Sequence, residues 1–296
     1  MGADGTLTWR ELLDETALRI GAKPQARWLC EEASGYSADE FRDVLDTQAT
    51  ERCVAHLDAM VARVLSGEPL QYVLGHWAFR TLDLMVDPRV LIPRPETELI
   101  VDIVKEMIFD PPRTQVRARD RRPVVVDLGT GSGAIGLAVA AESPRDSVTV
   151  WLTDESEDAL AVARANVAGL GARASVVRLA IGNWFAALPD EIRGEVDVIV
   201  SNPPYIADGD PEVEKLVELN EPRGALFAGP EGLDDIRQIV ESATEWLRSD
   251  GSLVIEIGYK QGEQATSIAK DAGFHDVEIR KDLSGRDRFL ICRLKG

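Results

Sequence analysis

The stretch VVVDLGTGSGAIG, at residues 124–136, joins an apolar run to a glycine-rich turn and the start of a second apolar segment. The valines predict a buried strand, and the glycines allow the backbone to turn tightly and to approach a ligand closely. The helix expected after the turn presents unpaired N–H groups at its N-terminus, which favour negative charge. The stretch therefore predicts a strand, a turn and a helix that bind a nucleotide-like ligand.

Residues 96–296 continue this alternation of strands and helices, interrupted by a polar segment at 111–122 that predicts a loop. We expect further strands at 148–152, 174–179, 196–201 and 252–257, helices at 135–141, 157–169, 233–247 and 261–271, and two final strands at 277–281 and 289–294. Apolar strands alternating with helices are typical of a mostly parallel sheet covered on both faces. The last two strands, with no helix between them, predict an antiparallel hairpin at one edge.

The N-terminal part of the chain has a different pattern. Thr8 and Ser37 each precede a glutamate by three residues, a capping pattern that opens helices, and no alternating strand pattern interrupts this part. Residues 75–95 then change to short, alternating apolar runs that predict a hairpin. We therefore expect a helical domain at 1–74, a β-hairpin connector at 75–95 and an α/β domain at 96–296.

Charge and composition restrict the partners. The chain has 51 acidic against 33 basic residues, a net charge of −18. Because nucleic-acid binding depends on lysines and arginines that neutralise phosphates, long contact with bare DNA is disfavoured and a basic protein partner fits better. The three cysteines and three histidines are scattered, which predicts reduced thiols and no metal site.

The N-terminus lacks the basic and apolar regions of a signal peptide, and no apolar run approaches the roughly 20 residues that span a bilayer. We expect a soluble, cytoplasmic protein without a membrane partner.

Two further strand ends carry polar residues. Asp154 follows the second expected strand, where a carboxylate accepts hydrogen bonds from the ribose hydroxyls of a nucleotide. Asn183 and Trp184 follow the third strand, where an amide can bond the adenine edge and an aromatic ring can pack on its face. Phe185 is expected to lie in the core.

The sequence NPPY, at 202–205, directly follows the apolar strand at 196–201. The Asn202 side-chain oxygen and the Pro203 carbonyl can both accept hydrogen bonds from one NH2 group, while Tyr205 lies against the planar group that carries it. Such a site suits a nitrogen with a conjugated lone pair, either an amide or the exocyclic amine of a base. The two acceptors orient this nitrogen and become stronger as positive charge develops on it. No general base is needed, because the methylated nitrogen can lose its proton to water.

Together with these motifs, several others extend along nearly the whole chain: EPLQY at 68–72, LIPRPETE at 91–98, EPR at 221–223 and LSGRDR at 283–288. On these residues the sequence resembles the PrmC/HemK family, the peptide chain release factor glutamine N5-methyltransferases. The resemblance implies a class I, Rossmann-like methyltransferase with a seven-stranded, mostly parallel sheet behind a helical substrate-recognition domain. It implies a methyl transfer from S-adenosylmethionine, with S-adenosylhomocysteine as product, to the glutamine of the Gly-Gly-Gln motif in bacterial release factors.

The resemblance also implies roles for individual residues. The positions expected to bind the cofactor are Gly129, Thr130, Gly131, Ser132, Gly133, Asp154, Asn183, Trp184 and Asn202. The positions expected to bind the glutamine are Asn202, Pro203, Pro204 and Tyr205, of which Asn202, Pro203 and Tyr205 are expected to be catalytic. Two departures stand out: Asn183 replaces an aspartate of many relatives, and the sequence HWAF at 76–79 differs from the family's usual Phe-Tyr-Gly connector.

Three alternatives remain open. DNA adenine-N6 methyltransferases use the same arrangement on another conjugated amine, although this chain lacks a basic target-recognition insertion. A nicotinamide oxidoreductase would use the Gly131, Gly133 and Gly136 pattern with Asp154 but leaves 202–205 without a role. The third is a non-catalytic scaffold that binds the cofactor. We expect a monomer without direct contact to nucleic acid.

Overall fold

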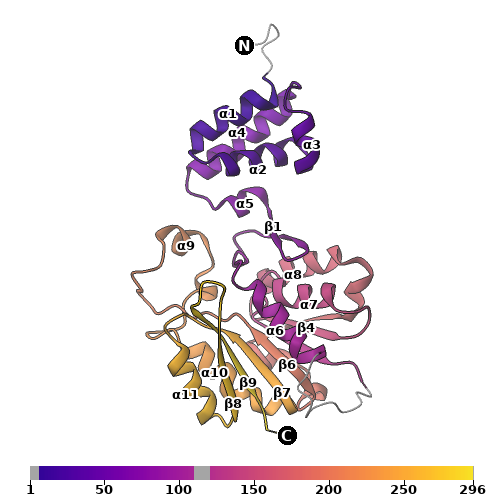
Figure 1. The fold of residues 1–296 in the computed structure, drawn as a ribbon, viewed down its shortest axis with the longest axis vertical. Coiled ribbons are helices and arrows are strands. Elements are labelled where there is room, and N and C mark those ends of the chain that lie inside the picture. The colour runs from indigo at the N-terminus through magenta and orange to yellow at the C-terminus, as the bar shows by residue number, and fades with distance from the viewer. Residues whose placement is uncertain (1–6, 110–120, 296) are drawn as a thin grey trace. The chain divides into compact units, whose positions relative to one another are not determined.

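The computed structural model describes residues 7–109 and 121–295, so most of the loop predicted at 111–122 lies outside the described residues. The chain divides into two compact units, one up to His76 and one from Trp77 onward (Figure 1). Each unit is described by itself. The three-part division into 1–74, 75–95 and 96–296 stays a prediction.

The first unit is helical, as predicted. Its helices are α1 (Trp9–Ile20), α2 (Lys23–Ser34), α3 (Ala38–Asp43), α4 (Glu51–Leu65) and α5 (Leu70–Leu74). The side chains of Thr8 and Ser37 accept hydrogen bonds from the backbone N–H groups of Glu11 and Glu40, so both predicted capping boxes are present. Buried side chains from the helices form one apolar core around Phe41.

The predicted hairpin consists of β1 (His76–Phe79) and β2 (Leu82–Met85), which form a two-stranded sheet. Its buried Phe79 and Leu84 belong to the same apolar core as helices of the second unit. The backbone N–H of Met85 also donates to Asn166 Oδ1 over 2.7 Å. The hairpin therefore packs onto the α/β unit.

The second unit contains a seven-stranded sheet. Its strands are β3 (Val124–Leu128), β4 (Thr149–Asp154), β5 (Val177–Ile181), β6 (Val196–Ser201), β7 (Leu247–Glu256), β8 (Asp276–Lys281) and β9 (Asp287–Arg293). They lie in the order β5-β4-β3-β6-β7-β9-β8, and β9 alone runs antiparallel to its neighbours. The mostly parallel sheet is confirmed, and the final hairpin is antiparallel with β9 inserted between β7 and β8.

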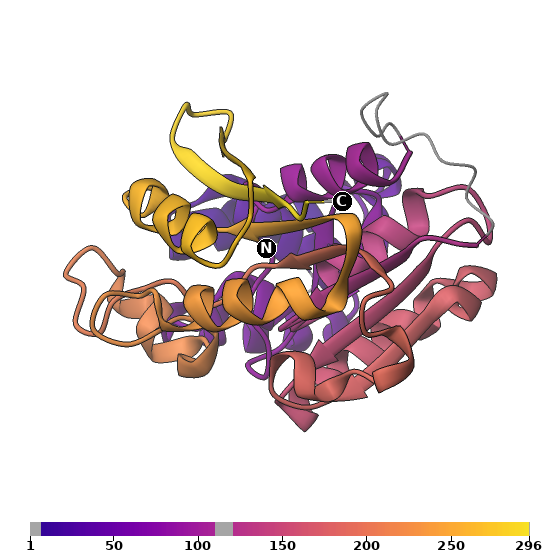
Figure 2. The same ribbon diagram turned by 90° about the horizontal axis from the view of Figure 1, so that it is seen from below.

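Helices cover both faces of this sheet. They are α6 (Glu98–Phe109), α7 (Ala134–Glu142), α8 (Glu157–Gly169), α10 (Asp234–Trp246) and α11 (Gly262–Asp271). The short helix α9 (Lys215–Asn220) has no buried residue and lies in the loop after β6. Buried side chains of α6 and α7 share one apolar core with alternate residues of the strands, and those of α10 and α11 share a second. Figure 2 shows α6 and α10 on opposite sides of the sheet.

Some predicted boundaries are wrong. The third strand does not begin at 174, because Gly171–Val176 forms a 3-10 helix and the strand starts at Val177. This turn begins at a glycine with φ of +57°, and its alanines and serine are too short a run to show helical periodicity. The strand expected at 252–257 begins earlier, at Leu247, which pairs with Val196 before an irregularity in the ladder.

Candidate active site

The carboxyl ends of three parallel strands meet at one edge of the sheet. Leu128, the last residue of β3, pairs with Thr153 on one side and Ser201 on the other. Successive strands are added in opposite directions from β3, so the sheet order reverses between β3 and β6, where ligand crevices form in open α/β sheets. The residues that follow β3 and β6 and the last residue of β4, namely Gly129, Asn202 and Asp154, all line one cavity of about 510 Å³. This volume is typical of a small-molecule site.

The glycine-rich turn after β3 needs its glycines. Gly129, Gly131 and Gly133 have φ values of +64°, +55° and +87°, in the left-handed region that side chains disfavour. A Cβ on Gly129 would also stand 3.0 Å from the ring of Trp184. Gly129, Thr130, Gly131 and Ser132 line the cavity, whereas Gly133 does not line it and is the N-cap residue of α7.

Asp127 supports this turn from within the protein. It is 1% exposed, and its Oδ2 accepts hydrogen bonds from the Thr130 hydroxyl (2.6 Å) and the Gly136 N–H (2.9 Å). Burial raises the pKa of its carboxyl to about 7. Sequence reasoning assigned Asp127 no role, although its place between a buried strand and a glycine turn was a visible signal.

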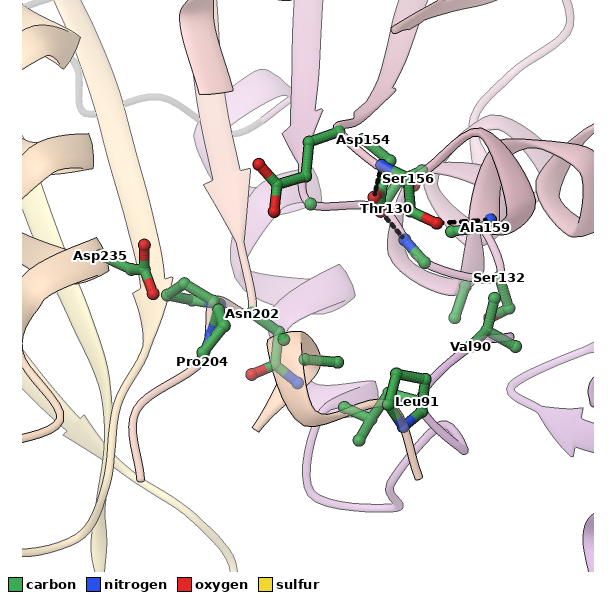
Figure 3. Close-up of a pocket in the computed structure, with 18 of the residues that line it drawn as sticks. Val90, Leu91, Thr130, Ser132, Asp154, Ser156, Ala159, Asn202, Pro204 and Asp235 are labelled. Carbon is green, nitrogen blue, oxygen red and sulfur yellow. Dashed lines mark hydrogen bonds between the residues drawn. The ribbon is translucent and has the colours of Figure 1, made fainter. Parts of the chain in front are cut away.

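Asp154 is held in place by two backbone groups. Its Oδ2 accepts from the Gly131 N–H and its Oδ1 from the Ser156 N–H, each over 2.9 Å (dashed in Figure 3). Each carboxylate oxygen has a further lone pair, which leaves an acceptor for each hydroxyl of a ribose. Burial raises the pKa of this carboxyl, and the two backbone hydrogen bonds oppose that rise.

Asn183 and Trp184 line the same cavity. The Asn183 NH2 donates to Glu155 Oε2 (2.9 Å), and its Oδ1 accepts from Gln238 Nε2 (3.1 Å), so the amide is already fixed by protein groups. Trp184 has a φ of +43°, which places its ring against Gly129. Contact of either residue with adenine stays a prediction.

Phe185 behaves as predicted. It is buried and stacks on Trp246, with ring centroids 5.8 Å apart.

Two acids that sequence reasoning missed also line the cavity. Glu155 follows Asp154 directly, and Asp235 lies in the first turn of α10. Burial is the main cause that raises the pKa of Asp235. An acid in the first turn of a helix is a common stabilising feature, so Asp235 carried no signal of its own.

The corner at 202–205 presents two free oxygens. Asn202, Pro203 and Pro204 line the cavity, and Figure 3 shows Asn202 and Pro204 across from Asp154 and Thr130. The Asn202 NH2 donates to Thr97 Oγ1 over 3.3 Å. Within residues 7–109 and 121–295, no hydrogen bond reaches Asn202 Oδ1 or the Pro203 carbonyl oxygen.

Tyr205 is placed differently from the other three residues of the corner. It does not line the cavity; its ring packs beside the core shared by α10 and α11. Its hydroxyl donates to Glu256 Oε1 over 3.2 Å, and burial raises its pKa. The predicted catalytic role of Tyr205 is not tested by this placement and stays a prediction.

A buried acid joins two of the motifs that sequence reasoning treated only as family signatures. Glu221, whose side chain is 2% exposed, accepts from Arg94 Nη2 over 2.5 Å and from the Ile92 N–H over 3.1 Å. It thereby ties the segment at 91–98 to the segment at 221–223, and Arg94 and Pro222 from these segments line the cavity.

The described part of the chain holds no group of three or more histidine, cysteine, aspartate or glutamate residues arranged for a metal ion. None of its helices is long and apolar enough to cross a membrane.

Comparisons with known proteins agree with this architecture. Residues 11–75 match the PrmC N-terminal domain, and residues 114–220 match the methyltransferase small domain. A release factor glutamine methyltransferase from Coxiella burnetii is 38% identical over 240 residues, covering 80% of this chain and 79% of that protein. The protein of the same name from Escherichia coli is 32% identical over 284 residues, covering 96% of each chain.

Among solved structures, a methyltransferase from Pyrococcus furiosus matches with a TM-score of 0.50 and 20% identity, covering 79% of this chain and 98% of that one. At this identity the likeness supports the fold alone. The sequence relatives support membership of a family as well, because their identity exceeds 30% over most of the chain. The chain belongs to the release factor glutamine methyltransferase family.

Proposed function

We propose that this protein transfers a methyl group from S-adenosylmethionine to the side-chain amide nitrogen of the glutamine in the Gly-Gly-Gln motif of bacterial release factors. The observation that carries the proposal is the pair of unbonded oxygens, Asn202 Oδ1 and the Pro203 carbonyl, on the cavity that Asp154 and the glycine turn also line. The names of the curated relatives support the same substrate.

The charge around the cavity favours a cationic cofactor. Both arginines that line it are ion-paired, Arg89 with Asp87 and Arg94 with Glu221. Among the described residues, the lining acids Asp154, Glu155 and Asp235 have no ion pair. S-adenosylmethionine supplies a methyl group on a positively charged sulfur, which suits such a cavity. The negative pyrophosphate of a nicotinamide dinucleotide does not, so the oxidoreductase alternative is disfavoured.

The chain's residues fit the parts of this cofactor. The carboxylate of Asp154 accepts hydrogen bonds from the ribose hydroxyls. The hydrogen bond that it accepts from the Gly131 N–H fixes its position relative to the glycine turn. Trp184 offers a flat apolar surface, and Asn183 with Glu155 offers polar groups for the adenine edge. Because these side chains are fixed by hydrogen bonds or packing before the ligand arrives, little ordering entropy is lost on binding.

The asparagine–proline corner orients the substrate. Asn202 Oδ1 and the Pro203 carbonyl each accept one N–H of the glutamine amide, which turns the nitrogen toward the donor methyl. As the nitrogen gains positive charge, both hydrogen bonds become stronger, so they stabilise the transition state more than the bound substrate. The nitrogen then loses its proton to water, since an alkylated amide nitrogen is strongly acidic.

The proposal is tested by incubating the full chain with unmodified release factor and labelled S-adenosylmethionine. We expect label on the glutamine of the Gly-Gly-Gln motif, located by peptide mass spectrometry. A release factor with that glutamine changed to alanine is the matched control and should take no label. Label on duplex DNA but none on the release factor would instead favour the adenine-N6 alternative.

We further propose that the enzyme acts as a monomer in the cytoplasm and binds no nucleic acid directly. Its net charge of −18 opposes contact with phosphates and favours a protein substrate, and release factors act on cytoplasmic ribosomes. Sedimentation at micromolar concentration should give the mass of one chain, and a dimer mass would contradict this.

A further inference from the structure

A buried chain of polar groups leads from the asparagine corner into the sheet. The Asn202 NH2 donates to Thr97 Oγ1 (3.3 Å), and the Thr97 hydroxyl donates to Glu256 Oε2 (2.7 Å). The other oxygen of Glu256 accepts from the Tyr205 hydroxyl (3.2 Å). Thr97 is 3% exposed and Glu256 only 1%. Because burying a carboxyl group is unfavourable, we expect the buried Glu256 at the end of β7 to have a role.

The number of available protons fixes which group donates and which accepts in this series of hydrogen bonds. A threonine hydroxyl has one proton to donate, and Thr97 gives it to Glu256. The Thr97 oxygen can then only accept toward Asn202, so the NH2 end of the Asn202 amide must face Thr97. The oxygen end must consequently face away from Thr97, where no described residue bonds it. The two ends of an asparagine amide have nearly the same shape, so hydrogen bonds decide which end points where.

The alternative orientation would be unproductive. If Glu256 did not take the Thr97 proton, the hydroxyl could rotate and donate to Asn202 Oδ1. The amide would then present its NH2 to the substrate, where a donor meets the donors of the glutamine NH2. One of the two acceptors in the corner would be lost.

The groups around Glu256 shift the pKa of its carboxyl in opposite directions. Burial and the negative charge of Glu96 raise this pKa, whereas the hydrogen bond from Thr97, the positive charge of Arg288 and the hydrogen bond from Tyr205 oppose the rise. Arg288 is itself held by Asp282, with Nε and Oδ2 3.5 Å apart.

We propose that Thr97 and Glu256 are positioning residues that fix the direction of the Asn202 amide, so that its oxygen rather than its NH2 faces the substrate. This proposal rests on the methyl transfer proposed above. The proposal also explains the hydrogen bond of the Tyr205 hydroxyl. This hydroxyl donates to Glu256 Oε1, so Glu256 Oε2 is left to accept from Thr97.

The test compares two changes at one position. Thr97→Val keeps the shape of the side chain but removes the hydroxyl, while Thr97→Ser keeps the hydroxyl. We expect kcat to fall by about tenfold or more in Thr97→Val, because misdirection of one catalytic group can cost up to about 100-fold. Thr97→Ser should stay within about threefold of the wild type, and the Kd for S-adenosylhomocysteine should change by less than about twofold in both.

A double change separates positioning from folding. In an Asn202→Ala background, Thr97→Val should have no further effect on the residual rate, because residues that act through one another are not additive. Thr16→Val, which removes a buried hydroxyl in the first unit, controls for the loss of a buried polar group. Unfolding temperatures of all variants are measured alongside.

The variant Glu256→Gln tests the acceptor role of Glu256 independently. A glutamine amide offers one accepting end, so it cannot take protons from both Thr97 and Tyr205, and kcat should again fall by about tenfold.

The outcomes separate the two proposals. A wild type that leaves the release factor unlabelled refutes the proposed function itself. A wild type that labels it, with Thr97→Val equally active or with equal fold-losses in the presence and absence of Asn202, refutes the positioning role alone.

Discussion

The two sides of the cavity are built in different ways. On the cofactor side, Asp154 is held by the Gly131 and Ser156 N–H groups, and Asp127 by Thr130 and Gly136. These are short-range or neighbouring-strand contacts, mostly to the backbone. On the substrate side, Asn202 is held by the side chain of Thr97, 105 positions earlier in the chain, and Thr97 is held by Glu256, 159 positions after Thr97. Backbone contacts tolerate sequence change, whereas the substrate side depends on a few specific side chains.

This contrast predicts that changes on the substrate side reduce turnover and those on the cofactor side reduce affinity. The largest effect is expected for Asn202→Ala, which removes one of two acceptors whose strength grows in the transition state. Loss of one such group typically lowers kcat by about 10²- to 10³-fold. Single-turnover rates with release factor, and Kd for S-adenosylhomocysteine by calorimetry, would check this. An equal loss of rate and cofactor affinity would contradict the separation of the two sides.

The next effect belongs to the cofactor side. Asp154→Ala removes the proposed acceptor of the ribose hydroxyls. Hydrogen bonds to charged groups contribute about 1.5–3 kcal/mol, so Kd for the cofactor should rise by roughly 10- to 100-fold. At saturating cofactor kcat should stay within about threefold of the wild type. Unchanged affinity would show that the carboxylate only supports the turn through Gly131.

The same contrast explains what the sequence could and could not predict. The glycine turn, Asp154 and the corner at 202–205 follow directly from apolar strands, so their meeting at one edge is a consequence of a parallel sheet. The role of Glu256 could not be predicted from the sequence, because an acid at the end of an apolar strand is equally typical of a surface residue. Its proposed role depends on its burial and on its hydrogen bond with Thr97, a partner that local sequence patterns do not indicate.

Short elements were missed for a related reason. The 3-10 helix Trp184–Ala187 and the helix α9 are too short to show a periodic pattern. The first of these matters to the site, because it begins at Trp184, whose left-handed backbone places its ring against Gly129. The sequence predicted a role for Trp184 but not the left-handed backbone conformation that orients its ring.

The packing of that ring gives a smaller effect. Gly129→Ala and Gly131→Ala both force a side chain into the left-handed region, at about 1–2 kcal/mol each. Only at Gly129 does the new Cβ meet the Trp184 ring, whereas nothing lies within 4 Å at Gly131. We expect Gly129→Ala to lower the free energy of unfolding further, by about 1 kcal/mol, measured by denaturant titration without cofactor. Equal losses would indicate that the ring moves aside freely.

The smallest effect within the ordinary working range concerns pH. Burial raises the pKa of the Asp154 carboxyl, so the folded protein takes up a proton there at a higher pH than a free aspartate would. The charged form accepts from the ribose, so cofactor affinity should be constant above this raised pKa and fall as the pH drops through it.

Calorimetric titrations with S-adenosylhomocysteine from pH 8 downward would follow this loss. Asp154→Asn provides the matched control, because an amide cannot take up the proton; its affinity should be weaker at pH 8 and should change less on acidification. The hydrogen bonds from the Gly131 and Ser156 N–H groups oppose this rise in the pKa of Asp154. A parallel decline in the wild type and Asp154→Asn would assign the pH dependence to another group, of which the buried Asp127, with a pKa raised to about 7, is the nearest candidate on the cofactor side.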